Sequence, residues 1–206
     1  MTVSSRDVEK LAGAIVRRSG RGPTLVSLEG PAGAGKTTLA AALVDRLGGH
    51  GPAAVVHGDD FFRPLPWAER VSMSPRQGYR RLFEWQRLRD QVLVPLSAGR
   101  AASYERYDRV TNGRRQDAPG RVAPTGTVIV EGVLTARPEL AHFYRLIVFV
   151  DTPGDVCLRR LYARGADAQR LAWLRTWRAV ERHYFTSTGL RSRAHVTLVA
   201  GRGEVT

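Results

Sequence analysis

Short apolar runs alternate with longer amphipathic segments along this chain. Apolar runs that predict five strands occupy residues 24–29, 53–57, 127–130, 145–150 and 196–199. Segments that predict helices occupy residues 5–18, 38–47, 79–94, 153–164 and 167–185. Uninterrupted apolar strands separated by helices are typical of a parallel sheet covered on both faces. We therefore expect an α/β fold with a five-stranded, mostly parallel sheet and helices on both faces.

Two segments do not fit this alternation. Residues 61–78 are rich in proline and aromatic residues, which predicts an excursion over the surface. Residues 97–124 are polar, basic and rich in turn formers, which predicts a short hairpin or an irregular insert. A length of 206 residues fits one domain, with or without a mobile lid, so we interpret 1–206 as a single domain.

The net charge of +13 comes almost entirely from arginine, since Lys10 and Lys36 are the only lysines. The arginines are scattered rather than gathered in one block, so a solvated surface and a polyanionic nucleotide ligand explain the charge better than nucleic acid does. No apolar run is long enough to span a membrane, and residues 1–18 lack the core of a signal peptide, so we expect a cytoplasmic protein. The single Cys157 excludes an internal disulfide and a cysteine-rich metal site. The sequence is compatible with a homo-oligomer and does not decide the oligomeric state.

Residues 30–37 read GPAGAGKT and fit the pattern G-x-x-x-x-G-K-[ST] of a phosphate-binding loop. An apolar strand precedes this loop and a helical segment follows it, as the P-loop NTPase fold requires. Glycines let successive N–H groups turn inward toward phosphate oxygens, and the helix N-terminus favours the same anion. Lys36 is expected to reach the outer phosphates and to take part in catalysis, and Thr37 to bind magnesium, so ATP and Mg²⁺ are the predicted cofactors. The predicted nucleotide-binding residues are Gly30, Ala32, Gly33, Ala34, Gly35, Lys36, Thr37 and Thr38.

Carboxylates follow three of the predicted strands. Asp59 and Asp60 follow the second strand, Glu131 follows the third and Asp151 follows the fourth. Ligands of open parallel sheets lie beyond the carboxyl ends of the strands. A kinase that acts on a hydroxyl needs a base beside the acceptor and acids near magnesium. We predict Asp59 as the base and Glu131, with Thr37 and Asp59, as the metal environment, whereas Asp60 and Asp151 are interpreted as loop or helix-capping carboxylates.

Three arginines lie between the fourth strand and the last long helix, and they fall within the segment 153–170. Arg159, Arg160 and Arg164 could match phosphate oxygens, and a small lid carrying them would exclude water during transfer. We predict catalytic roles for Arg159 and Arg164 and nucleotide binding for Arg160. A solvated helix face is the alternative for any one of them.

Several landmarks together resemble the uridine kinase family of P-loop nucleoside kinases. They are GPAGAGKTT, then HGDDFFR at 57–63, FEW at 83–85, YERYDR at 104–109, and VEG at 130–132 followed by VDTPGDVCLRRLYARG. The resemblance covers most of 24–200 and is weakest across 64–78 and 110–126. It implies that the excursion at 60–126 binds the acceptor.

The resemblance also assigns acceptor-site residues. Asp59 matches the family's catalytic base, Glu84 falls where the family grips ribose hydroxyls, and Tyr107 matches an acceptor-site aromatic. Phe62 replaces a tyrosine and Asn112 falls about where the family has a base-contacting histidine. These departures all lie on the acceptor side, which leaves uridine itself unsupported.

The function predicted from the sequence is transfer of the γ-phosphate of MgATP to a hydroxyl of a nucleoside or nucleoside-like small molecule. The alternatives are a kinase of another hydroxylated metabolite such as a pantothenate- or sugar-like alcohol, a polynucleotide 5′-kinase, and a regulatory ATP-binding module without catalysis. His57 is interpreted as a structural or surface residue because no metal-ligand spacing surrounds it. Trp173 and Trp177, four residues apart, are interpreted as helix packing rather than as a stacking platform for a base.

Overall fold

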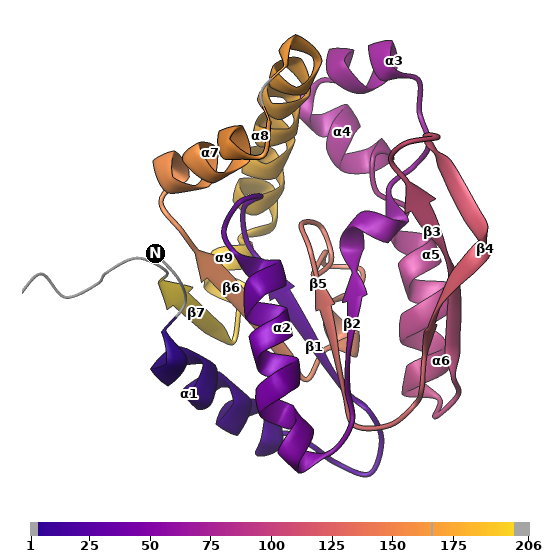
Figure 1. The fold of residues 1–206 in the computed structure, drawn as a ribbon, viewed down its shortest axis with the longest axis vertical. Coiled ribbons are helices and arrows are strands. Elements are labelled where there is room, and N and C mark those ends of the chain that lie inside the picture. The colour runs from indigo at the N-terminus through magenta and orange to yellow at the C-terminus, as the bar shows by residue number, and fades with distance from the viewer. Residues whose placement is uncertain (1–3, 166, 200–206) are drawn as a thin grey trace, which may run out of the picture.

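The computed structural model describes residues 4–165 and 167–199, and its centre is a five-stranded parallel sheet in the order β2-β5-β1-β6-β7 (Figure 1). The five strands are β1 (Thr24–Glu29), β2 (Ala53–His57), β5 (Thr127–Glu131), β6 (Leu146–Asp151) and β7 (Val196–Val199). Every neighbouring pair in this sheet is parallel. The expected α/β, P-loop NTPase architecture is therefore confirmed, with a fully parallel sheet.

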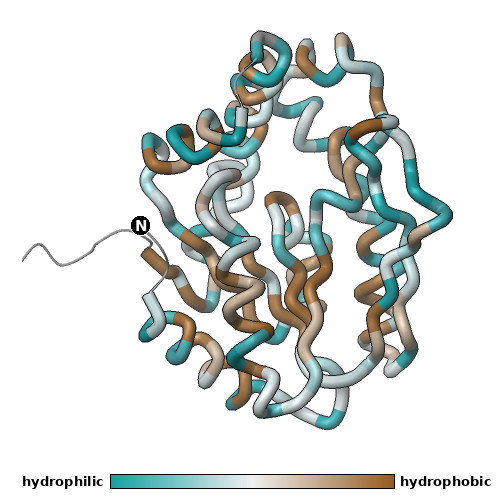
Figure 2. The backbone as a smooth tube through the Cα atoms, in the orientation of Figure 1, coloured by the Kyte–Doolittle hydropathy of each residue, from teal (hydrophilic) through white to brown (hydrophobic). Residues whose placement is uncertain are grey.

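The side chains of the sheet divide between two apolar cores, one on each face. On one face Val26 and Val148 pack with α1 (Ser5–Val16) and α2 (Lys36–Leu47). On the other face Leu25 and Phe149 belong to the larger core. The hydrophobic strands run through the middle of the molecule in Figure 2. Helices cover both faces because alternate residues of these strands need burial on opposite sides.

The remaining helices and a separate hairpin complete the fold. Several of them pack on the larger core, whereas the helix that carries Cys157 packs on the core of the first face. The helices are α3 (Trp67–Ser72), α4 (Pro75–Arg81), α5 (Trp85–Leu88), α6 (Val94–Ser97), α7 (Gly154–Ala163), α8 (Ala168–Thr188) and α9 (Leu190–Arg193). The hairpin consists of β3 (Ala102–Asp108) and β4 (Gly113–Val122), which pair antiparallel. It lies beyond β2 at the edge of the molecule (Figure 1). Of the two structures expected for 97–124, the chain forms the hairpin.

The prediction of one continuous helix over 79–94 is wrong, because the chain is extended between α4 and α5. Phe83 forms an isolated bridge with Phe62. The Arg63 N–H donates to Leu82 O at 2.9 Å, and the Glu84 N–H donates to Phe61 O at 2.8 Å. This pairing with the segment after β2 satisfies the backbone and buries both phenylalanines, so tertiary contacts override the helical spacing. From Trp85 the helix continues through a π turn, Arg89–Leu93, into α6.

In the described part of the chain no helix is long and apolar enough to cross a membrane.

Candidate active site

A cavity of about 330 Å³ opens at the carboxyl ends of the central strands. The phosphate loop forms one end of it, and the excursion after β2, the β3–β4 hairpin, α7 and α8 supply the rest. The lining residues that concern the argument are Ala32, Gly33, Gly35, Lys36, Thr37, Thr38, Asp59, Phe62, Trp67, Arg70, Tyr107, Arg109, Glu131, Arg164, Arg170, Trp173 and Trp177. The location is the one expected for ligands of an open parallel sheet.

The phosphate loop has the backbone shape that an anion requires. Gly30 and Gly33 have φ values of 139° and 83°, and a Cβ there would lie 2.4 Å from Val150 O and 2.6 Å from Cys157 O. Only glycine fits such positions. Lys36 is the first residue of α2, and its ammonium group donates to the carbonyls of Gly30 at 2.7 Å and Pro31 at 2.9 Å. The loop, the lysine and the helix N-terminus together fit a nucleotide polyphosphate.

Two buried carboxylates accept hydrogen bonds from the backbone of the loop, and the sequence analysis assigned a role to neither. Glu181 of α8 accepts a hydrogen bond from the Ala32 N–H at 2.7 Å. Glu29, the last residue of β1, accepts from the Ala136 N–H at 2.8 Å and from the Tyr184 hydroxyl at 2.9 Å. Burial raises the pKa of Glu181, and it raises the pKa of Glu29 to about 7 against the opposing hydrogen bond from Ala136.

Thr37 and Glu131 meet where β1 and β5 end. The Thr37 hydroxyl donates to Glu131 Oε1 at 3.2 Å, and His57 Nδ1 lies 2.8 Å from the same oxygen. Burial is the largest single influence on Glu131 and opposes its ionisation. The hydrogen bond from His57 and the charge of Lys36 lead the influences that outweigh it, and they hold the pKa of Glu131 below its usual range. The hydrogen bond to Glu131 in turn raises the pKa of His57.

This corner has the composition of a magnesium site that relies on substrate oxygens. Among residues 4–165 and 167–199 no three His, Cys, Asp or Glu side chains gather into a metal-binding group. Magnesium is commonly held by one or two carboxylates together with phosphate oxygens and water, so a hydroxyl and an ionised carboxylate fit it. His57 was interpreted as structural or surface. Its contact with Glu131 follows from the register of β2 and β5, in which the two residues are partners.

Asp59 and Asp60 are neighbours in sequence with different surroundings. Asp59 lines the cavity and forms an ion pair with Arg109 from the turn of the hairpin. Asp60 is absent from the cavity lining and lies 3.9 Å from Arg106, and burial raises its pKa. Of the two, Asp59 is the carboxylate that an acceptor in the cavity could reach.

The predicted acceptor aromatics are at the cavity, and Asn112 supports them from outside its lining. Phe62 and Tyr107 both line the cavity. The Tyr107 hydroxyl donates to Asn112 Oδ1 at 2.9 Å, and Asn112 Nδ2 donates to Leu65 O at 2.9 Å. Asn112 therefore positions Tyr107, and the structure does not place it where it would touch an acceptor.

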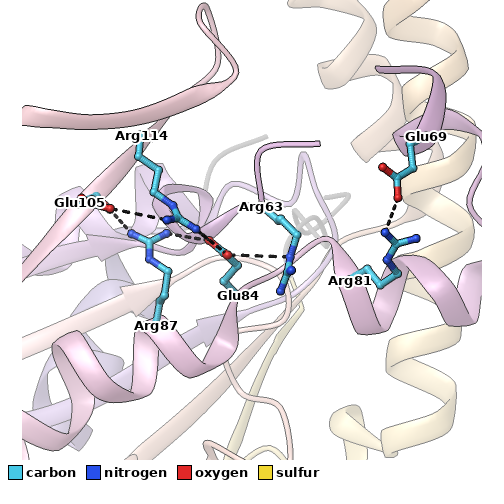
Figure 3. A network of polar contacts seen from close by, with 7 residues as sticks. All are labelled: Arg63, Glu69, Arg81, Glu84, Arg87, Glu105 and Arg114. Atoms are coloured by element: carbon cyan, nitrogen blue, oxygen red, sulfur yellow. Dashed lines mark hydrogen bonds and ion pairs between the residues drawn. The ribbon is translucent and has the colours of Figure 1, made fainter. Parts of the chain in front are cut away.

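Glu84 does not reach the cavity, contrary to what the resemblance implied. Its carboxylate accepts hydrogen bonds from Arg114 at 2.8 Å and from Arg87 at 3.1 Å, and Arg63 lies 3.9 Å away (Figure 3). The residue is 8% exposed. A buried carboxylate that is satisfied by arginines serves as an internal counter-ion, so this arrangement explains Glu84 without an acceptor.

The three arginines predicted for the lid lie in different environments. Arg164 lines the cavity. Arg160 donates to the Gly33 and Ala34 carbonyls at 3.0 and 3.2 Å, and so fixes the phosphate loop. Arg159 is exposed and pairs with Asp155 at 2.6 Å along α7, outside the cavity lining, so the structure does not support its expected catalytic position. Within the predicted lid segment 153–170, Ala166 lies outside the described residues.

Several residues at the cavity were missed or interpreted differently from the sequence. Trp67, Arg70, Arg109 and Arg170 line it without having been assigned a role there. Trp173 and Trp177 also line it, and their rings stack with centroids 5.5 Å apart. The two tryptophans therefore pack on each other, as expected, and also face the cavity, as a stacking platform for a base would. Sequence periodicity could not predict that residues of α3 and α8 line one cavity, because these two helices meet only in the folded chain.

A family profile and the relatives found by sequence agree on one family. The profile of the phosphoribulokinase/uridine kinase family matches residues 25–170. The uridine kinase of Halobacterium salinarum is 30% identical over 141 residues, which cover 66% of this chain and 60% of that protein. The uridine kinase of Deinococcus deserti is 30% identical over 144 residues, covering 68% and 67% of the two chains. The structure described as a possible uridine kinase from Bacillus stearothermophilus superposes with a TM-score of 0.71 at 23% identity, covering 94% of this chain and 98% of the other.

Proposed function

Because the chain belongs to the phosphoribulokinase/uridine kinase family, we propose that it transfers the γ-phosphoryl group of MgATP to a hydroxyl of a small molecule. The observation that carries the proposal is that Asp59 lines the same cavity as Lys36 and Thr37. A nucleotide-binding module without catalysis has no need of a carboxylate at that position. The aromatic wall formed by Phe62, Tyr107 and Trp177 favours an acceptor with a planar or apolar body, as a nucleoside-like compound has.

The residues divide the work of the reaction. When bound, ATP would supply the phosphoryl group, and its magnesium ion would supply the positive charge that stabilises the transfer. The N–H groups of the phosphate loop and Lys36 hold the phosphate oxygens, while Thr37 and Glu131 would hold the metal. Asp59 orients the acceptor hydroxyl and takes its proton at a carboxylate oxygen. Arg164 and Arg170 lie where they can meet negative charge and exclude water.

Acceptor-dependent ADP release tests the proposal. Purified protein is incubated with MgATP and a panel of nucleosides, sugars and hydroxy acids, and ADP is measured above the background without acceptor. We expect at least one compound to raise the rate and to gain one phosphate by mass spectrometry. ATP binding without any acceptor-dependent ADP across the panel would instead favour the regulatory module.

A further inference from the structure

Arg70 of α3 lies among aromatic rings at the acceptor end of the cavity. Its guanidinium carbon is 4.7 Å from the ring centroid of Trp173, 5.6 Å from that of Tyr107 and 5.9 Å from that of Phe62. One guanidinium nitrogen donates to the Tyr107 hydroxyl at 2.8 Å. The side chain is thus held by rings and by one hydrogen bond at the cavity wall.

Arg70 has no carboxylate partner among the described residues, whereas other arginines of this part of the fold each have one. Arg81 pairs with Glu69, the residue that precedes Arg70, and Arg63, Arg87 and Arg114 all face Glu84 (Figure 3). The Nε atom of Arg70 is buried and has no hydrogen-bond partner. The acids of this region are therefore already paired with other arginines.

A half-buried guanidinium without a counter-ion is costly unless something compensates its charge. Ring faces compensate it in part, whereas a carboxylate that accepts two parallel N–H bonds matches the geometry of the group far better. Two acids share the cavity with Arg70, and both are already engaged: Asp59 pairs with Arg109, and Glu131 contacts His57 and Thr37. An anion brought by the ligand is the partner that this environment lacks.

The absence of Glu84 from the cavity points to the same class of acceptor. A neutral diol would find no carboxylate at the aromatic end to accept its hydroxyl protons, because Glu84 is held by Arg87 and Arg114. Arg164 and Arg170 also line the cavity and are the arginines assigned above to the transferred phosphate, whereas Arg70 lies over the rings of Phe62, Tyr107 and Trp173. One guanidinium at that end suits a monoanion, since a dianionic phosphate needs more donors than it offers. We infer that the acceptor is a hydroxy acid with an apolar or aromatic body, whose carboxylate binds Arg70 while its hydroxyl faces Asp59. The inference rests on the proposed kinase function.

Matched acids and amides test Arg70 directly. Binding of a panel of aromatic hydroxy acids, such as 3-phenyllactate, and of their neutral amides is measured by calorimetry with ADP present. We expect at least one acid to bind ten-fold or more tightly than its amide to the wild type. In Arg70→Met that preference should fall toward one through loss of acid binding, with ADP affinity unchanged. Arg70→Lys, which keeps the charge without the fork, should lie between, and it replaces Arg70→Met if thermal unfolding shows that variant to be misfolded.

Arg81→Met is the matched control, because Arg81 pairs with Glu69 on an exposed surface outside the cavity lining. It should keep the full preference for the acid. If no acid binds more tightly than its amide, or if the preference survives in Arg70→Met, the inference is overturned. ADP release with the same compounds and with neutral nucleosides separates this result from the kinase proposal. If only neutral acceptors are turned over, the hydroxy-acid inference is overturned and the kinase proposal stands. If acids bind in an Arg70-dependent way but no acceptor is turned over, the acid-binding site stands and the kinase proposal is overturned.

Discussion

Glu181 accepts a hydrogen bond from the Ala32 N–H at 2.7 Å, across a sequence separation of 149 residues. The contact ties α8 to the first half of the phosphate loop. The N–H that donates to Glu181 belongs to the third residue of the loop, Ala32, which also lines the cavity. Glu181 is 3% exposed, so the contact is a buried link between the wall of the acceptor site and the phosphate site.

Loss of this link should loosen the loop. Glu181→Ala leaves the Ala32 N–H without its partner, which should cost about 1–3 kcal/mol of stability and raise the KM for ATP. Glu181→Gln keeps an acceptor oxygen, so its stability and its KM for ATP should both stay close to those of the wild type. Chemical denaturation and ATP kinetics on the two variants check this, and equal damage in both would mean that the charge rather than the hydrogen bond matters.

The buried Glu29 should give the protein a distinct dependence of stability on pH. Its pKa is about 7 in the folded protein against 4.5 for an unperturbed glutamate, so between these values the folded state holds a proton that the unfolded state has lost. Its contribution to stability is therefore complete below pH 4.5 and is lost as the pH rises toward 7, by about 3 kcal/mol. Denaturation across pH 4.5–8 should show this fall in the wild type and a much flatter profile in Glu29→Gln.

Tyr184→Phe provides a second check on Glu29. The hydroxyl of Tyr184 donates to Glu29 and lowers its pKa, so its removal should extend the fall in stability to higher pH. Identical pH profiles for the wild type and Glu29→Gln would show that Glu29 does not titrate in this range.

The sequence predicted the parts of this structure whose signals are local. The strands are apolar runs, and the phosphate loop needs glycine at fixed positions, so both could be read directly from the chain. The break at Leu82–Glu84 could not, because Phe83 pairs with Phe62 only after folding. Arg70 and Glu181 were missed for the same reason, since their partners lie on distant elements. Glu84 was placed by resemblance, which does not record that nearby arginines neutralise it.

The two lysines of the chain allow a direct test of the phosphate loop. Lys36→Ala removes the cation that faces the loop carbonyls and the predicted phosphates, so turnover should fall to background and MgATP affinity should drop sharply. Lys10 is exposed on α1 and lies outside the cavity lining, so Lys10→Ala, which removes the same charge, should leave activity unchanged. Near-normal turnover in folded Lys36→Ala would remove the phosphate loop from the proposed site.

Arg164 and Arg159 should respond differently to truncation. Arg164 lines the cavity, so Arg164→Ala should lower kcat on the order of 10- to 100-fold, with a smaller change in ATP affinity. Arg159 pairs with Asp155 on the surface, and Arg159→Ala should change both parameters less than two-fold or so. Steady-state kinetics decide between them. A large loss of kcat in Arg159→Ala would indicate that α7 turns during closure and brings this side chain inward.

The mechanism depends most on the choice between Asp59 and Asp60. Asp59 lines the cavity with Lys36 and Thr37, whereas Asp60 lies outside its lining, near Arg106. Asp59→Asn keeps the size of the side chain and removes the proton acceptor. We therefore expect kcat to fall on the order of 10²–10⁴-fold, the usual range for loss of a general base, with little change in MgATP affinity. Asp60→Asn is the matched control and should be milder, because its carboxylate does not face the cavity. Kinetics at saturating acceptor, with MgATP binding measured separately, distinguish the two variants. Loss of turnover in Asp60→Asn with an active Asp59→Asn would transfer the role of the base to Asp60 and would require the segment after β2 to rotate when the acceptor binds.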